Sequence, residues 1–154
     1  MTIPYRKILV PLDGSAVADQ ALPHAQHLAV QSSAELILFE VVPEVHPEIK
    51  LKNDAHLALS GAEAQQSLVD QSAEALEVLA DNLRFHQIQA EAVVEVGEPA
   101  SKIVEYAAAH ATDLIVMCTH GRTGLQRLAY GSIANQVLTT APCPVLLVRS
   151  QLCQ

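Results

Sequence analysis

Five short segments of the chain are mostly apolar and rich in β-branched residues. Runs of this kind predict strands that are buried on both faces of a sheet, because a half-exposed strand would show a polar face. In the third run the apolar positions alternate with more polar ones, and this period of two predicts a strand with one wetter face. The predicted strands lie at 8–12, 35–42, 90–96, 113–118 and 144–149.

Helices are predicted between these strands, because apolar residues there recur at spacings of three and four. The first begins after a Ser15 cap, and Pro23 predicts a kink within it, since proline removes one backbone donor. The segment 43–61 has no clear period and contains two prolines, which indicates a loop. The predicted helices run from Ser15 through Ala29, from Ala62 to His86, from Pro99 through Ala108 and from about Ser132 through Leu138.

The alternation of strands and helices predicts a single α/β domain over residues 1–154. Right-handed crossovers, with the winding reversed after the first strand, give a doubly wound five-stranded parallel sheet of order 3-2-1-4-5 with helices on both faces. In such sheets the ligand crevice lies beyond the carboxyl ends of the two strands at the reversal, here the first and the fourth. The topology therefore singles out Asp13 and the loop from Cys118 to Ser132.

The excess of acidic over basic residues limits the kinds of molecule that the protein is expected to bind. Nine Lys and Arg against 17 Asp and Glu give a formal net charge of −8 at pH 7, which disfavours nucleic acid and anionic membranes. No run reaches the ~18–20 apolar residues of a membrane span and no secretory leader is predicted, so the expected compartment is the cytoplasm. Three scattered cysteines indicate reduced thiols, and His24 and His27 lack a third ligand for a metal. A small anion held by backbone N–H groups remains compatible with this surface.

The loop between the fourth strand and the last helix carries residues that suit such an anion. Gly131 lets a phosphate approach the main chain, and the free N–H groups from Ser132 onward favour negative charge at the helix start. Gly121 frees the loop just after the strand, and Arg122 and Arg127 are the nearby cations. The same residues also suit a plain strand-to-helix loop, with glycines for the turns and Ser132 as the cap.

Asp13 ends the first strand, across the predicted crevice from that loop. A carboxylate at this place can accept hydrogen bonds from a ribose hydroxyl or a base, as acidic residues do in other nucleotide-binding folds. The alternative is a local Asx turn ahead of the Ser15 cap. The convergence of Asp13 and Gly131 on one switch point makes nucleotide binding the leading hypothesis.

Stretches along the whole chain resemble the universal stress protein family. They are Lys7–Ser15 (KILVPLDGS), Gly97–Pro99, Asp113–Met117, Gly131–Ala134 and Cys143–Val148. The ATP-binding branch of that family has a loop pattern of Gly, two residues, Gly, nine residues and then Gly-Ser or Gly-Thr. Here Gly121 is the second glycine and Gly131 with Ser132 closes the pattern, whereas Cys118 stands where the first glycine would be. The resemblance also implies a Rossmann-like fold of the adenine nucleotide α-hydrolase type.

The ligand that the resemblance implies is ATP, alone or together with Mg²⁺. The implied binding residues are Pro11, Asp13, Val41, Cys118, Gly121, Arg122, Gly131, Ser132 and Ile133. By position, Asp13 and Val41 hold the adenosine, and the main-chain donors of the two glycines, Ser132 and Ile133 hold the phosphates. Cys118 lies beside the ribose and phosphates in this pattern, so its side chain either crowds the nucleotide or turns aside.

Members of the family dimerise through the last strand, and an unpaired apolar edge strand does favour pairing with its copy. The residues concerned are Val145, Leu146, Leu147 and Val148. The implied function is that of a cytosolic, non-enzymatic regulatory protein whose dimer or partner behaviour follows nucleotide occupancy. Two alternatives stay open: a nucleotide-free dimeric interaction module in which Cys118 blocks the site, and a slow ATPase that uses His120 as a base.

Overall fold

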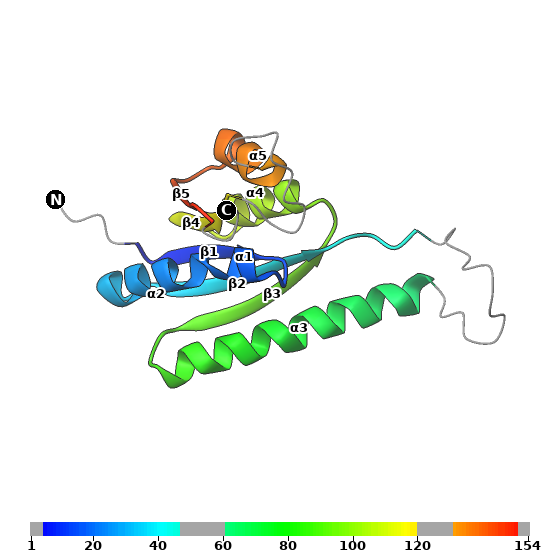
Figure 1. The fold of residues 1–154 in the computed structure, drawn as a ribbon, viewed down its shortest axis with the longest axis horizontal. Helices are drawn as coiled ribbons and strands as arrows, with labels where there is room; N and C mark the ends of the chain where they lie inside the picture. Colours follow the sequence, from blue (N-terminus) through cyan, green and yellow to red (C-terminus); the bar gives the residue numbers. More distant parts are fainter. Residues whose placement is uncertain (1–4, 47–60, 120–130, 151–154) are drawn as a thin grey trace.

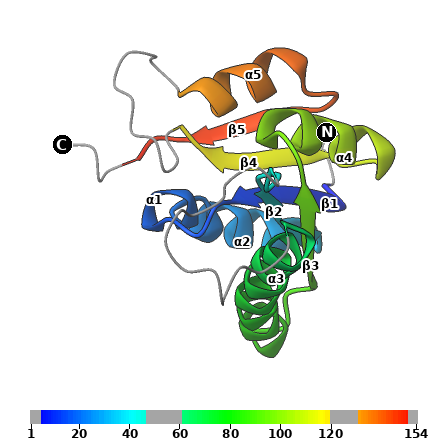
Figure 2. The ribbon, with the colours of Figure 1, turned by 90° about the vertical axis from the view of Figure 1, so that its right-hand side faces the viewer.

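A parallel sheet of five strands in the order β3-β2-β1-β4-β5 forms the centre of the molecule (Figure 2). The computed structural model describes residues 5–46, 61–119 and 131–150. In these ranges the strands are β1 (Lys7–Leu12), β2 (Glu35–Val42), β3 (Ala90–Val96), β4 (Leu114–Cys118) and β5 (Val145–Val148). The predicted doubly wound topology, with its reversal after the first strand, is therefore confirmed.

Helices cover both faces of the sheet (Figure 1), as the burial of parallel sheets requires. One face packs against α1 (Ala16–Asp19), α2 (Ala21–Ser32) and α3 (Gly61–Phe85), and the other against α4 (Pro99–Ala109) and α5 (Ser132–Thr140). Among the helices in the described ranges, none has both the length and the apolarity that crossing a membrane requires.

Alternate residues of the central strands point into two separate cores. Ile8 and Leu36 pack in the core beneath α2 and α3, whereas Leu9 and Ile37 pack in the core beneath α4 and α5. All four side chains are fully buried. Because both faces are covered, these strands need no polar positions, which explains the continuous apolar runs in the sequence.

The first helical stretch differs from the expectation at Pro23. The helix is interrupted at Gln20 instead of being kinked at Pro23, and the proline becomes the third residue of α2. A proline in the first turn removes an N–H that has no acceptor within the helix. The break three residues earlier therefore accommodates the proline without the loss of a helical hydrogen bond, and the predicted kink was wrong.

Backbone pairing between β1 and its two neighbours is unequal. β1 pairs with β2 over the whole range Lys7–Leu12, but with β4 only through Ile8 and Leu9. Pro11, which has no N–H to donate, lies beyond the end of this shorter ladder. The β1–β4 ladder thus stops before the carboxyl ends of the two strands, which is the switch point of the topology.

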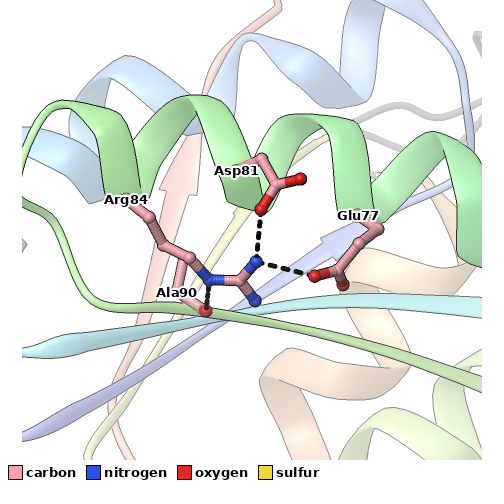
Figure 3. A network of polar contacts seen from close by, with 4 residues as sticks. All are labelled: Glu77, Asp81, Arg84 and Ala90. Carbon is pink, nitrogen blue, oxygen red and sulfur yellow. Dashed lines mark hydrogen bonds and ion pairs between the residues drawn. The ribbon is translucent and has the colours of Figure 1, made fainter.

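Near the amino-terminal end of the sheet, Arg84 in the last turn of α3 makes three side-chain contacts (Figure 3). Its Nε donates to the carbonyl oxygen of Ala90, the first residue of β3, at 2.9 Å. Its Nη1 donates to Glu77 Oε1 at 2.6 Å and to Asp81 Oδ1 at 2.8 Å. The bond to Ala90 joins the end of α3 to the start of β3, at the end of the sheet opposite to the switch point, while the two carboxylates of α3 hold the guanidinium in place.

Candidate functional site

Asp13 follows β1 directly and is held in one orientation by Ser15. Its Oδ1 accepts hydrogen bonds from the Ser15 backbone N–H at 2.9 Å and from the Ser15 hydroxyl at 2.5 Å. Ser15 Oγ in turn accepts from the N–H of Ala18 at 3.1 Å and caps α1. The Asx turn that we considered for Asp13 is therefore present, and it fixes the carboxylate at the carboxyl end of β1.

Gly131, Ser132 and Ile133 form the start of α5. Gly131 is the N-cap with φ 77° and ψ 154°, a conformation that favours glycine because a Cβ would be strained there. Its carbonyl accepts from the Asn135 N–H at 3.0 Å, but it has no side chain with which to cap the helix. The first backbone N–H groups of a helix have no acceptor within it. Those of α5 can therefore be offered to an anion.

Pro11 and Val41 lie near the carboxyl ends of β1 and β2, where they pair with Phe39 and Glu95 respectively. Both side chains are partly exposed. Val41 packs against the core beneath α4 and α5. The two residues therefore share the edge of the sheet from which Asp13 projects.

Cys118, the last residue of β4, turns its side chain into the core beneath α1, α2 and α3. It is 6% exposed, and its Sγ donates to the carbonyl oxygen of Ala18 at 3.8 Å. Burial raises the pKa of the thiol to about 11, helped by the charges of Asp13 and Asp19 and opposed by the Ala21 N–H. The side chain of Cys118 thus lies in this core, and its thiol is protonated at neutral pH.

The model of the universal stress protein family matches residues 4–149. The chain belongs to this family. Among its relatives is the universal stress protein MJ0531 of Methanocaldococcus jannaschii, which is 36% identical over 145 residues, covering 94% of this chain and 82% of the relative. The family inferred from the sequence motifs is therefore confirmed.

Solved structures of other family members have the same fold. Protein MJ0577, also of Methanocaldococcus jannaschii, superimposes with a TM-score of 0.81 at 27% identity, over 97% of this chain and 99% of that one. A universal stress protein from Archaeoglobus fulgidus, solved in complex with dAMP, has a TM-score of 0.60 at 20% identity, over 94% and 98% of the two chains. These structures confirm the α/β architecture of this universal stress protein.

Part of the predicted site lies outside the described residues. Gly121 and Arg122 belong to the range 120–130, as do His120 and Arg127. The loop that would link β4 to Gly131 therefore stays a prediction from the spacing. In the ranges that the structure does describe, no group of three or more His, Cys, Asp or Glu side chains could hold a metal ion.

Asp19 is a residue of this region that the sequence did not single out. It ends α1, and its pKa is raised by burial and, to a lesser degree, by the charge of Asp13. Asp19 falls within the single helix predicted from Ser15 through Ala29, where a carboxylate outside the apolar positions carries no particular signal. Only the break at Gln20 and the packing of α1 on β4 bring Asp19 close to Asp13 and Cys118.

Proposed function

We propose that this universal stress protein binds an adenine nucleotide, with ATP as the expected ligand, at the switch point between β1 and β4. The observation that carries the proposal is the convergence of two features at one edge of the sheet. Asp13 is fixed there as a hydrogen-bond acceptor, and α5 begins there with a glycine whose helix offers its N–H groups. Asp13 can accept hydrogen bonds from a ribose or base, and the start of α5 can donate hydrogen bonds to phosphates. These two roles match the two parts of a nucleotide.

Different residues would bind different parts of the nucleotide. Asp13 and Val41 would hold the adenosine, and the main-chain N–H groups at Gly131, Ser132 and Ile133 would hold the phosphates. Gly121 and Arg122 would complete the phosphate side, as the loop spacing predicts. Backbone donors suit this chain because its net charge of −8 rules against a broadly basic surface. Mg²⁺ enters the proposal only as a counter-ion of the phosphates.

The orientation of Cys118 favours this proposal over a nucleotide-free interaction module. That alternative rests on the thiol filling the space beside the nucleotide. Cys118 instead packs with the α1 to α3 layer, whereas Val41 packs with the opposite layer. The dAMP complex of the Archaeoglobus protein, which shares the fold, makes adenine nucleotides the first ligand class to test.

The proposed assembly is a cytoplasmic homodimer that pairs through β5. Leu146 in this edge strand is 38% exposed, and no charged residue interrupts Val145–Val148. An apolar edge strand without charged residues favours pairing with the same strand of a second copy. Nucleotide occupancy would then change the behaviour of the dimer or of its partners.

Calorimetry tests the proposal directly. The purified protein is denatured and its extract analysed for nucleotide, and ATP is titrated into protein freed of ligand. We expect bound adenine nucleotide in the extract or saturable ATP binding with a dissociation constant in the micromolar range. If neither appears, the nucleotide-free module becomes the better description. Phosphate release that disappears in His120→Ala would instead support the slow ATPase.

A further inference from the structure

The break between α1 and α2 is closed by a side chain from a distant strand. Ala18, in the last turn of α1, presents its carbonyl oxygen at this break. The thiol of Cys118 contacts this carbonyl: Sγ donates to the Ala18 oxygen at 3.8 Å. One sulfur atom therefore joins the carboxyl end of β4 to α1, 100 residues away in the sequence.

From Ala18 the contacts continue to the candidate ligand carboxylate. The Ala18 N–H donates to Ser15 Oγ at 3.1 Å, and the Ser15 hydroxyl donates to Asp13 Oδ1 at 2.5 Å. The Asp19 N–H, one residue further on, donates to the Ser15 carbonyl at 3.1 Å. Because α1 is a single turn of four residues, a shift of Ala18 moves Ser15 with it. The carboxylate of Asp13 follows, since both of its bonds from Ser15 end on Oδ1.

We propose that Cys118 is a positioning residue, which fixes the α1–α2 break and, through Ala18 and Ser15, orients the carboxylate of Asp13 toward the nucleotide. This inference rests on the proposed function for its effect on binding. The glycine that the family pattern has at this position offers no side chain for the task. In this chain Cys118 thus supports the site. It does not block the space for a nucleotide. Its burial and its protonated state suit it to hydrogen bonding and not to redox chemistry.

Substitutions at Cys118 separate positioning from packing. Cys118→Ala and Cys118→Gly remove the hydrogen bond to Ala18, whereas Cys118→Ser keeps a donor in a smaller side chain. For the full chain we expect ATP to bind about five-fold more weakly to Cys118→Ala and Cys118→Gly, as the loss of a single weak hydrogen bond would produce. Cys118→Ser should stay within about two-fold of the unaltered protein. Cys143→Ala, which removes the other cysteine of the described ranges, is the matched control.

A second readout follows Asp13 itself and does not need nucleotide. The titration of the Asp13 carboxyl carbon, measured by NMR, should shift in Cys118→Ala and return toward the original curve in Cys118→Ser. A shift in a protein that binds no ATP would support the positioning role while the proposed function fails. ATP affinity and Asp13 titration both unchanged in Cys118→Ala would overturn the inference, even if the variant is less stable. Equal losses in Cys118→Ala and Cys118→Ser would also overturn it, because the loss would then follow side-chain volume.

Discussion

Two helices on the same face of the sheet, α4 and α5, begin in opposite ways. α4 has Glu98 as its N-cap, whose Oε1 accepts from the Ala100 N–H at 3.1 Å and whose Oε2 accepts from the Ser101 N–H at 2.8 Å. The Ser101 hydroxyl adds a third bond to Oε2 at 2.7 Å. α5 has Gly131 in the corresponding place, which contributes no side chain.

The difference shows that one fold can cap the backbone N–H groups at the start of one helix and leave those of another helix without a side-chain cap. At α4 the chain supplies its own carboxylate to the backbone N–H groups and to the positive end of the helix dipole. At α5 a glycine with positive φ stands where such a carboxylate would be. α4 follows β3, at the edge of the sheet, whereas α5 follows β4, at the switch point. The uncapped start therefore lies where the topology predicts a ligand.

The largest expected effect is the stabilisation of the protein by ATP. At a thousand times its dissociation constant, ATP should raise the free energy of unfolding by about 4 kcal/mol. Gly131→Val should abolish this gain, because the side chain covers the backbone N–H groups that receive the phosphates. Urea unfolding with and without ATP measures the gain in the unaltered protein and its loss in Gly131→Val. Gly97→Ala, at the positive-φ glycine just before the Glu98 cap of α4, should lower stability but keep the gain from ATP.

Converting the start of α5 into one like that of α4 should have the next largest effect. Gly131→Asp places a carboxylate at the N-cap, which competes with the phosphates for the N–H groups and repels them. We expect ATP affinity to fall about 100-fold, equivalent to about 2.7 kcal/mol. Gly131→Asn suffers the same backbone strain without the charge, so calorimetry should find a clearly smaller loss. Equal losses in the two variants would mean that charge at this helix start does not matter.

The reverse change, opening the start of α4, should alter stability and not binding. Glu98→Ala leaves the Ala100 and Ser101 N–H groups without their cap, which typically costs about 1 kcal/mol. Thermal and urea unfolding measure this loss. ATP affinity should be unchanged, because α4 lies away from the switch point. A fall in affinity comparable to that of the Gly131 variants would place α4 within the site and contradict the comparison.

The smallest effect is the acid dependence of the α4 start. Bonds from the Ser101 hydroxyl and N–H, with a further one from the Ala100 N–H, lower the pKa of Glu98 below its ordinary value. A carboxyl with a lowered folded-state pKa contributes stability above its unfolded pKa of about 4.3, and this contribution is lost as the pH falls. The stability difference between the unaltered protein and Glu98→Gln should therefore shrink between about pH 5 and pH 3. Gly131→Ala, which involves no carboxylate, should show a constant difference over the same range.

Much of this could be predicted from the sequence because it depends on local patterns. Apolar periodicity predicted the strands and helices, and the chain order with the right-handed crossover rule predicted the sheet order. Asp13 and Gly131 could be proposed as ligand residues because a switch point follows from topology alone. The break at Gln20 was missed, since the apolar stripe runs through it without a change of period. Asp19 was missed for the same reason.

The sequence by itself therefore determined the family and the order of the sheet, and it proposed an edge of the sheet for a ligand. Only the tertiary structure decided what Cys118 contacts. Strand alternation tells which residues of β4 share a face with Cys118. Which helices cover that face depends on the path of the whole chain. The hydrogen bonds that join Cys118 to Ala18, and Ala18 through Ser15 to Asp13, connect residues about 100 positions apart. No local pattern records such contacts, because they exist only once β4 and α1 are packed together.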